Sequence, residues 1–163
     1  MFGYAGKILE VNLSNGSVKI RETPEKLVRD FIGGRGLGAA LLWKNLKPEV
    51  DPLSPENPLI FTTGPATGTP LPACARSEVV TKSPLTNTYL CSSAGGFFGA
   101  ELKFAGFDCL VIKGKASRPS WLYVTNDGVE LRDASDLWGN TTDQTEREIK
   151  KDMKTTKLSI ISI

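Results

Sequence analysis

The sequence predicts an α+β fold in which mostly antiparallel β-sheets are combined with short helices. Apolar residues alternate with polar ones on both sides of Asn15-Gly16 and again around Asn126-Asp127-Gly128, a pattern that is typical of β-hairpins. The other strand and helix patterns are short and do not follow the regular strand–helix–strand order of a parallel sheet. Because 163 residues suit one domain, we take residues 1–163 as a single domain.

The first part of the chain predicts a hairpin followed by two helices. Residues 7–13 and 18–20 are the two arms of the hairpin. Thr23-Pro24-Glu25 then offers an N-cap, a proline at the first helical position and an early acid, for a helix that ends at Gly33-Gly34. A second helix is expected over residues 37–46.

The rest of the chain alternates between turns and short elements. Four prolines between Pro48 and Pro58 indicate a loop, and residues 66–72 are again rich in turn formers. Short apolar or alternating runs predict strands, and helical spacing or caps predict helices. The predicted strands are residues 59–61, 77–81, 109–112, 121–124, 129–131 and 158–163, and the predicted helices are residues 97–105 and 142–153.

Two features of the C-terminal part carry further expectations. Thr141-x-x-Gln144 is a capping-box pattern at the head of the last helix. An apolar strand over residues 158–163 normally runs on into a loop, so we expect the chain to be truncated at its C-terminus. A natural edge strand is the alternative.

The composition excludes several classes of partner. Twenty Lys and Arg residues against eighteen Asp and Glu residues give a net charge of +2, without a basic stripe, so we expect no nucleic-acid partner. No apolar stretch approaches the ~20 residues that span a bilayer, and the N-terminus lacks the pattern of a signal peptide. We therefore expect a cytoplasmic protein with no membrane association.

Histidine and cysteine usage limits the chemistry of this chain. Histidine is absent, which removes Ser-His and Cys-His catalytic pairs and imidazole metal sites. Cys74, Cys91 and Cys109 show no Cys-x-x-Cys spacing, which argues against a disulfide framework and against an iron–sulfur or zinc site held by this chain alone.

Two segments have the residue types of an anion site. Arg76 follows a stretch of small residues and proline, and its planar guanidinium suits a phosphate or a carboxylate. The segment Ser92–Gly99 begins with five small residues, where backbone amides can approach an anion ahead of a helix. A surface arginine and a tight turn are the plain alternatives.

Other residues favour structural roles. The segment Gly34–Ala39 is a relaxed dinucleotide fingerprint, but a helical pattern precedes it where that motif needs a strand, so a glycine-rich link between two closely packed helices is favoured. The lone ionisable residues are expected to be solvated or paired, and they are Asp108, Lys82, Lys103 and Lys113. The tryptophans Trp43, Trp121 and Trp138 are expected to lie in or near the core.

Taken together, ordered blocks along the whole chain resemble the N-terminal domain of the aldehyde:ferredoxin oxidoreductase family. The blocks are Gly6-Lys7-Ile8-Leu9, Gly33-Gly34-Arg35-Gly36-Leu37, Asp51-Pro52-Leu53-Ser54-Pro55-Glu56-Asn57, Gly64-Pro65-Ala66-Thr67-Gly68-Thr69, Thr81-Lys82-Ser83-Pro84-Leu85-Thr86, the segment 94–106, Arg132-Asp133-Ala134-Ser135 and Leu137-Trp138-Gly139.

The resemblance implies a base of β-sheets that carries a tungsten, or molybdenum, bis-pterin cofactor. By position, Arg76 resembles the arginine that binds a pterin phosphate, and Gly95 a backbone contact to the pterin. Ser93 resembles the residue whose backbone carbonyl binds the magnesium ion between the two phosphates. This position is often asparagine in the family. A serine in its place still offers a backbone carbonyl as a ligand. The second phosphate-binding stretch is expected just beyond Ile163.

The same resemblance implies that the full-length enzyme oxidises a small aldehyde with water to a carboxylic acid. Its electrons would pass through a 4Fe-4S cluster to ferredoxin. The cluster cysteines and the proposed catalytic acid and histidine belong to later domains of the family. We therefore expect the isolated chain to be inactive and to have the remaining domains as partners, with a homodimer left open.

Two other functions stay open from the sequence. One is a non-catalytic short homologue, which would be a pterin-binding module or a gene remnant. The other is a generic binding protein with a dinucleotide site at Gly34–Ala39. Continuation of the reading frame with a later Cys-x-x-Cys would favour the enzyme.

Overall fold

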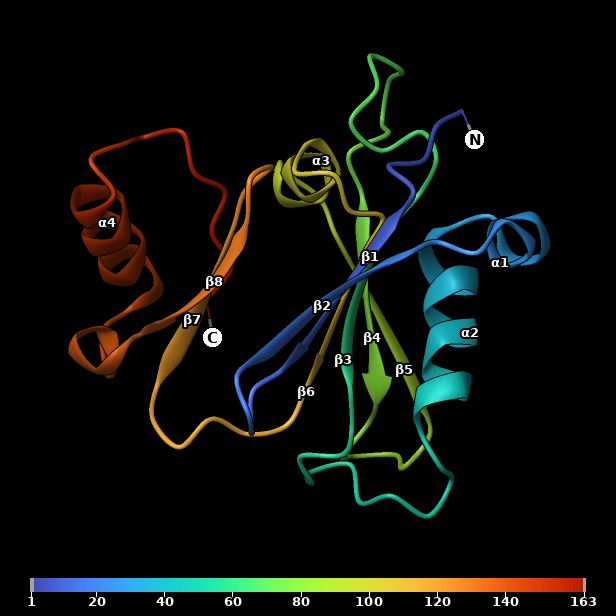
Figure 1. Cartoon of the computed structure of the whole chain (residues 1–163), viewed down its shortest axis with the longest axis horizontal. Helices are drawn as coiled ribbons and strands as arrows, with labels where there is room; N and C mark the ends of the chain where they lie inside the picture. The colour runs from blue at the N-terminus through green and yellow to red at the C-terminus, as the bar shows by residue number, and fades with distance from the viewer. Residues whose placement is uncertain (1, 163) are drawn as a thin grey trace.

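A six-stranded mixed sheet runs through the centre of the computed structural model, which describes residues 2–162 (Figure 1). Its strands are β1 (Lys7–Asn12), β2 (Ser17–Glu22), β3 (Leu59–Thr63), β4 (Ser77–Lys82), β5 (Tyr89–Ala94) and β6 (Cys109–Lys113). They are arranged in the order β2-β1-β6-β3-β4-β5. β1 and β6 are parallel, whereas the other neighbouring pairs are antiparallel. The predicted α+β class with mostly antiparallel pairing is therefore confirmed.

Helices cover one face of this sheet, and a helix with a hairpin covers the other (Figure 1). The helices α1 (Glu25–Phe31) and α2 (Gly34–Asn45) pack on the first face. The second face receives α3 (Phe98–Phe104) and the hairpin of β7 (Ser120–Val124) and β8 (Val129–Asp133). A short 3₁₀ turn, Ser135–Leu137, leads to α4 (Thr142–Asp152), which lies beside the hairpin.

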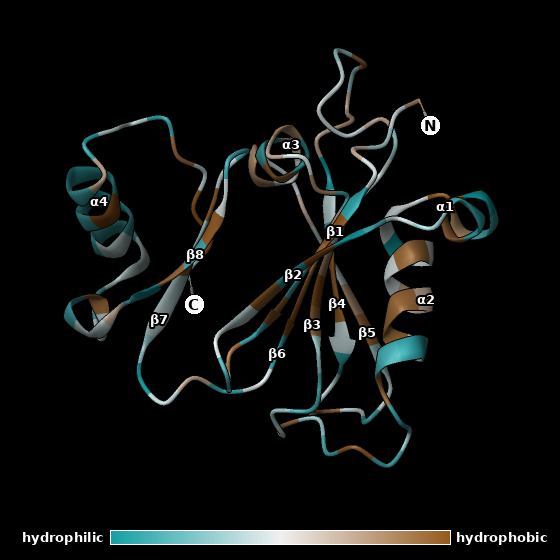
Figure 2. Cartoon of the chain, viewed as in Figure 1, coloured by the Kyte–Doolittle hydropathy of each residue, from teal (hydrophilic) through white to brown (hydrophobic). Residues whose placement is uncertain are grey.

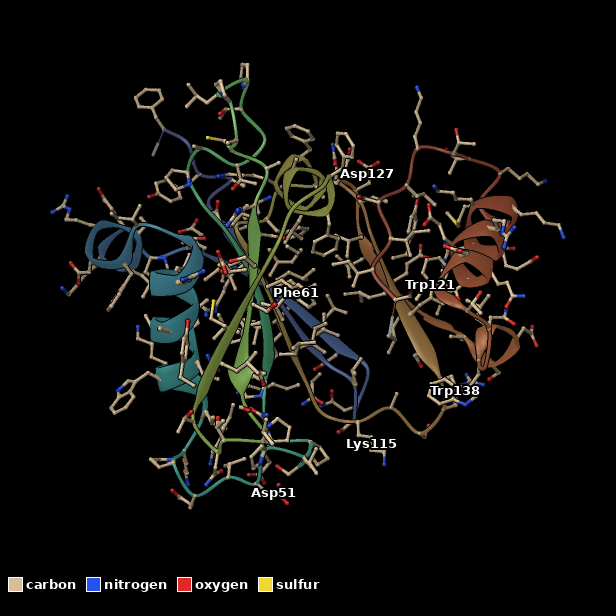
Figure 3. All side chains as sticks on the ribbon, turned by 180° about the vertical axis from the view of Figure 1, so that it is seen from behind. Asp51, Phe61, Lys115, Trp121, Asp127 and Trp138 are labelled. Atoms are coloured by element: carbon tan, nitrogen blue, oxygen red, sulfur yellow. The ribbon has the colours of Figure 1, made fainter. Side chains whose placement is uncertain are left out.

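Alternating side chains of the strands supply the two cores on the two faces of the sheet. Ile8, Ile60 and Val80 pack with α1 and α2 in the first core. Leu9 and Phe61 pack with α3 and the hairpin in the second. Figure 2 shows the apolar residues concentrated on these strands and on α2, and Figure 3 shows Phe61 in the middle of the molecule.

The buried carboxylate of Asp108 ties the N-terminal segment to the end of the sheet. Its side chain accepts the Ala5 and Gly6 backbone N–H groups at 2.8 and 2.7 Å. It also accepts the Thr23 hydroxyl at 3.2 Å. Asp108 is therefore paired, as expected, and the same holds for Lys82, Lys103 and Lys113, which donate to backbone carbonyls.

Most of the predicted elements are confirmed. Both hairpins form, with Leu9 opposite Ile20 in the first and Val124 opposite Val129 in the second. The capping box of α4 is also present, since Gln144 N–H donates to Thr141 Oγ1 at 3.4 Å and Thr141 N–H donates to Gln144 Oε1 at 2.9 Å.

Several element boundaries were predicted wrongly. Thr23 does not cap α1, because its hydroxyl donates to Asp108 and Pro24 occupies the N-cap position without a side-chain cap. α2 begins at Gly34 rather than residue 37. Residues 158–162 form no strand, because an apolar pattern supplies no ladder partner, and Ile163 lies outside the described residues.

Two of the three tryptophans were also predicted wrongly. Trp121 is half-buried on the outer hairpin (Figure 3). Trp43 is instead 84% exposed, because it lies on the outer side of α2. Trp138, directly after the 3₁₀ turn, is 75% exposed. No helix among residues 2–162 is long and apolar enough to cross a membrane.

Candidate functional site

An open hollow of about 290 Å³ lies where the start of α2, the β3–β4 loop and the start of β4 meet. Glycines and small residues form most of its wall, and Arg76 and Glu78 are its charged residues. The lining consists of Ile32, Gly33, Gly34, Gly64, Pro65, Ala66, Thr67, Ala73, Cys74, Arg76 and Glu78.

Two residues of the wall have a backbone conformation that L-amino acids rarely adopt. Ile32 has a φ of 60° and Ala73 a φ of 62°. The Tyr4 hydroxyl donates to the carbonyl of Ile32 at 2.8 Å, which holds this part of the wall in place. Backbone strain of this kind tends to gather at binding and catalytic sites. It therefore supports a functional role for the hollow.

Arg76 and Gly95 flank the end of the β4–β5 ladder. The ladder ends with the pair of Ser77 and Ala94, so Arg76 comes directly before β4 and Gly95 directly after β5. The buried Thr67 donates to the Arg76 carbonyl at 3.2 Å, which fixes the backbone ahead of β4. The guanidinium itself is exposed and makes no hydrogen bond or ion pair within residues 2–162.

The backbone beside Arg76 is open because of its glycines. A Cβ at Gly95 or Gly96 would meet nothing within 4 Å, and Gly96 has a φ of +87°. Gly99 differs, because a Cβ there would lie 2.9 Å from Ser77 Cβ. The glycines of this segment therefore serve two purposes: Gly99 allows close packing, whereas Gly95 and Gly96 leave the backbone accessible to a ligand.

A hydrogen-bonded cluster joins α2 to β4 and β5 at the edge of the hollow. Ser93, opposite Glu78 in the ladder, has its hydroxyl 2.8 and 2.7 Å from the two carboxylate oxygens of Glu78. Cys91 donates to Glu78 Oε2 at 3.1 Å. Arg35 donates to Ser93 Oγ at 3.1 Å and approaches Glu78 Oε2 at 3.5 Å.

Burial and hydrogen bonding shift the pKa values in this cluster. Burial by itself would raise the pKa of Glu78, but hydrogen bonds from Ser93 and Cys91 and the charge of Arg35 lower it overall. The carboxyl group is therefore ionised at neutral pH. The pKa of the Cys91 thiol is raised, first by burial and then by its hydrogen bond to Glu78.

Lys103 supports the wall of the hollow at Gly64. Its ammonium group donates to the carbonyl of Gly64 and lies 5.6 Å from the centre of the Tyr4 ring. Burial lowers the pKa of Lys103, while the charge of Asp108 opposes that shift. This lysine therefore connects α3 to the β3–β4 loop.

The structure brings the predicted site residues together at one end of β4 and β5. Arg76 lines the hollow, and Ser93 and Gly95 lie on or just after β5. The strand β5 was missed, because Ser92, Ser93 and Ala94 have low strand propensity and form a ladder only by pairing with β4.

Sequence reasoning also missed Arg35 and Glu78 as neighbours of the site. The available signal for Glu78 was an acid directly before the apolar pair Val79-Val80 of this strand. Arg35 gave no such signal, since its distance from Ser93 is decided by tertiary packing. The segment Gly34–Ala39 follows α1, not a strand, but it is the first part of α2 rather than a link between helices. Its glycines do permit close packing, since a Cβ at Gly36 would lie 2.7 Å from the Phe31 carbonyl oxygen of α1.

Comparisons with known proteins give a consistent result. The family profile described as aldehyde ferredoxin oxidoreductase, N-terminal domain, matches residues 8–163. The tungsten-containing aldehyde ferredoxin oxidoreductases of Thermococcus kodakarensis and Pyrococcus furiosus are 50% and 48% identical over 163 residues. These matches cover 100% of this chain, which spans 27% of the length of each relative.

A solved structure shows the same fold. It is the active site complex BamBC of benzoyl coenzyme A reductase in complex with 1,5-dienoyl-CoA. The superposition has a TM-score of 0.93 at 41% sequence identity, and it covers 96% of this chain and 24% of that one. From the profile match, the sequence identities and the shared fold, the chain belongs to the family of aldehyde ferredoxin oxidoreductase N-terminal domains.

Proposed function

We propose that this chain forms part of the seat for a tungsten, or molybdenum, bis-pterin cofactor in an aldehyde:ferredoxin oxidoreductase. In this proposal Arg76 binds a pterin phosphate, the backbone of Gly95 contacts the pterin, and the carbonyl of Ser93 binds the magnesium ion. The observation that carries the proposal, among the described residues, is an exposed, unpaired Arg76 guanidinium at the end of the ladder where the open backbone of Gly95 follows β5.

The residues present fit a phosphate-bearing group. A guanidinium binds phosphate through two parallel hydrogen bonds, and the Arg76 side chain has no competing partner within residues 2–162. The glycine positions leave space where a side chain would otherwise block the approach. Because β5 is an edge strand, alternate carbonyls along it point away from β4 and are available to a metal ion.

The bound cofactor would supply the chemistry, in which an aldehyde and water become a carboxylic acid with release of protons, and the electrons would pass through a 4Fe-4S cluster to ferredoxin. The residues of this chain would bind and orient that group. Arg76 would hold its phosphate at a fixed point. The Thr67 hydroxyl, which donates to the Arg76 carbonyl at 3.2 Å, would keep that arginine in place.

The phosphate site can be tested directly on the chain with inorganic phosphate as the probe. In a nuclear magnetic resonance titration at low salt, phosphate should shift the Arg76 side-chain signal and the backbone amides of Gly95 and Gly96. Arg76→Ala should weaken binding at least about tenfold. Arg29→Ala is the matched control, since Arg29 is an exposed arginine on α1. Equal binding by wild type and Arg76→Ala would contradict the proposal.

The magnesium site can be tested with manganese as a paramagnetic substitute. In the presence of phosphate, Mn²⁺ should broaden the backbone signals of Ser93 and Ala94 before those of other residues. Broadening confined to exposed acids such as Asp127 would argue against a Ser93 ligand. Elemental analysis of the protein from its natural source would decide between tungsten and molybdenum.

A further inference from the structure

Arg76 and Glu78 have opposite charges and lie close together, yet they do not pair. They are two positions apart on one extended segment, so their side chains leave the same face of the sheet. Both line the same hollow. The Arg35 guanidinium approaches the Glu78 carboxylate at 3.5 Å, as is typical of an ionised acid. An ion pair between the two would be expected if the Glu78 carboxylate were free to turn towards Arg76.

The hydrogen bonds of Glu78 explain why it does not pair with Arg76. One carboxylate oxygen accepts from Ser93 at 2.8 Å, and the other is 2.7 Å from Ser93 Oγ and 3.1 Å from Cys91 Sγ. The Arg35 guanidinium supplies the compensating charge at 3.5 Å. The Glu78 side chain is only 13% exposed, so there is little room for another donor.

Ser93 is the central member of this cluster. Its hydroxyl donates its single proton to Glu78 and accepts a hydrogen bond from Arg35 at 3.1 Å. The hydroxyl therefore holds the carboxylate beside Arg35 of α2. This role belongs to the side chain and is separate from any ligand role of the Ser93 carbonyl.

We propose that the Ser93 side chain keeps Arg76 free for phosphate by occupying the Glu78 carboxylate. Ser93 is thus a positioning residue that acts through Glu78, and its removal would allow Glu78 to capture Arg76. This inference rests on the proposed phosphate-binding function of Arg76.

Three variants of the chain test this inference, with inorganic phosphate as the probe. Ser93→Ala should weaken phosphate binding about fivefold, which corresponds to the formation of one partly exposed ion pair. Ser93→Asn should bind like wild type, because its amide N–H can still donate to Glu78. Combining Ser93→Ala with Glu78→Gln should restore binding, because a neutral amide does not capture Arg76.

The exchange of the Arg76 Nε proton with water gives a second readout that does not depend on phosphate. The exchange rates of this proton in wild type and in Glu78→Gln should differ by less than about twofold, since Arg76 is unpaired in both. In Ser93→Ala exchange should be about fivefold slower, because pairing protects the proton. If Ser93→Ala fails to fold, the comparison of wild type with Glu78→Gln still decides. Faster exchange in Glu78→Gln, by fivefold or more, would show that Glu78 already holds Arg76 and would overturn the inference.

The outcomes separate this inference from the proposed function. If Arg76→Ala leaves phosphate binding unchanged, the proposed function fails. If Arg76→Ala weakens binding but Ser93→Ala binds phosphate like wild type, the phosphate site stands and the inference is wrong. Failure of Glu78→Gln to restore binding in the double variant would also overturn it.

Discussion

Gly38 of α2 lies so close to Val80 of β4 that a Cβ on Gly38 would be 2.6 Å from Val80 Cγ2. The glycine therefore sets the distance between the helix and the sheet. Gly38→Ala should destabilise the fold by about 1–3 kcal/mol, because the overlap outweighs the better helix propensity of alanine. Chemical denaturation of the variant would measure this loss.

The control for this prediction is a glycine with free space around it. A Cβ at Gly128, in the turn of the outer hairpin, would meet nothing within 4 Å. Gly128→Ala should change the free energy of unfolding by less than about 0.5 kcal/mol. Combining Gly38→Ala with Val80→Ala should show non-additive behaviour, since the smaller residue 80 removes the overlap. Strict additivity would mean that the close contact is not the cause.

Asp108 is expected to be a principal anchor of the N-terminal segment. Its side chain is buried and accepts from Ala5, Gly6 and Thr23. Asp108→Asn removes the charge and one acceptor, and should lower the free energy of unfolding by about 2 kcal/mol. Asp127→Asn, in an exposed turn, should have an effect below about 0.5 kcal/mol. Similar urea midpoints for the two variants would refute this role.

The three cysteines should differ in their rate of alkylation. Burial is the main reason why the pKa values of the Cys109 and Cys91 thiols are raised, so only a small fraction of each is thiolate at pH 8. Cys74 lies half-buried on the wall of the hollow and should react first with iodoacetamide, followed by Cys91. Cys109 is buried and should react only after denaturation.

The pH dependence of Cys91 alkylation has a definite sign. Because its pKa is raised, its rate should keep increasing as the pH rises above 9, where an ordinary thiol approaches its plateau. Glu78→Gln removes the charged acceptor and should therefore increase the rate at pH 8. Peptide mapping by mass spectrometry measures each cysteine separately. An unchanged Cys91 rate in Glu78→Gln would exclude the hydrogen bond as a cause.

The capping box at Thr141 should control the stability of α4. The Thr141 hydroxyl accepts from Gln144 N–H, which has no partner within the helix. Thr141→Ala should weaken protection of the first turn of α4 from hydrogen exchange by about 1 kcal/mol, whereas Thr141→Ser should retain it. Equal loss in both variants would point to the methyl group instead.

Local sequence patterns predicted the elements whose cause is itself local. The hairpin around Asn15-Gly16 and the capping box of α4 each depend on residues that are neighbours in the chain. The strand β5 depends on β4, so its serine-rich sequence gave no local signal. Residues 158–162 have the apolar pattern of a strand, but a strand also needs a partner that the pattern does not supply.

The sequence by itself determined the α+β class and the family, because these follow from local patterns and ordered motifs, and it predicted Arg76 and the glycine-rich segment as parts of a site. Only the tertiary structure decided that Arg76 and Gly95 both lie at the end of the β4–β5 ladder and that Ser93 and Arg35 contact Glu78. The physical reason is that strand register and helix-on-sheet packing determine which distant side chains come within hydrogen-bonding distance. Neither of these is encoded in the spacing of any single segment.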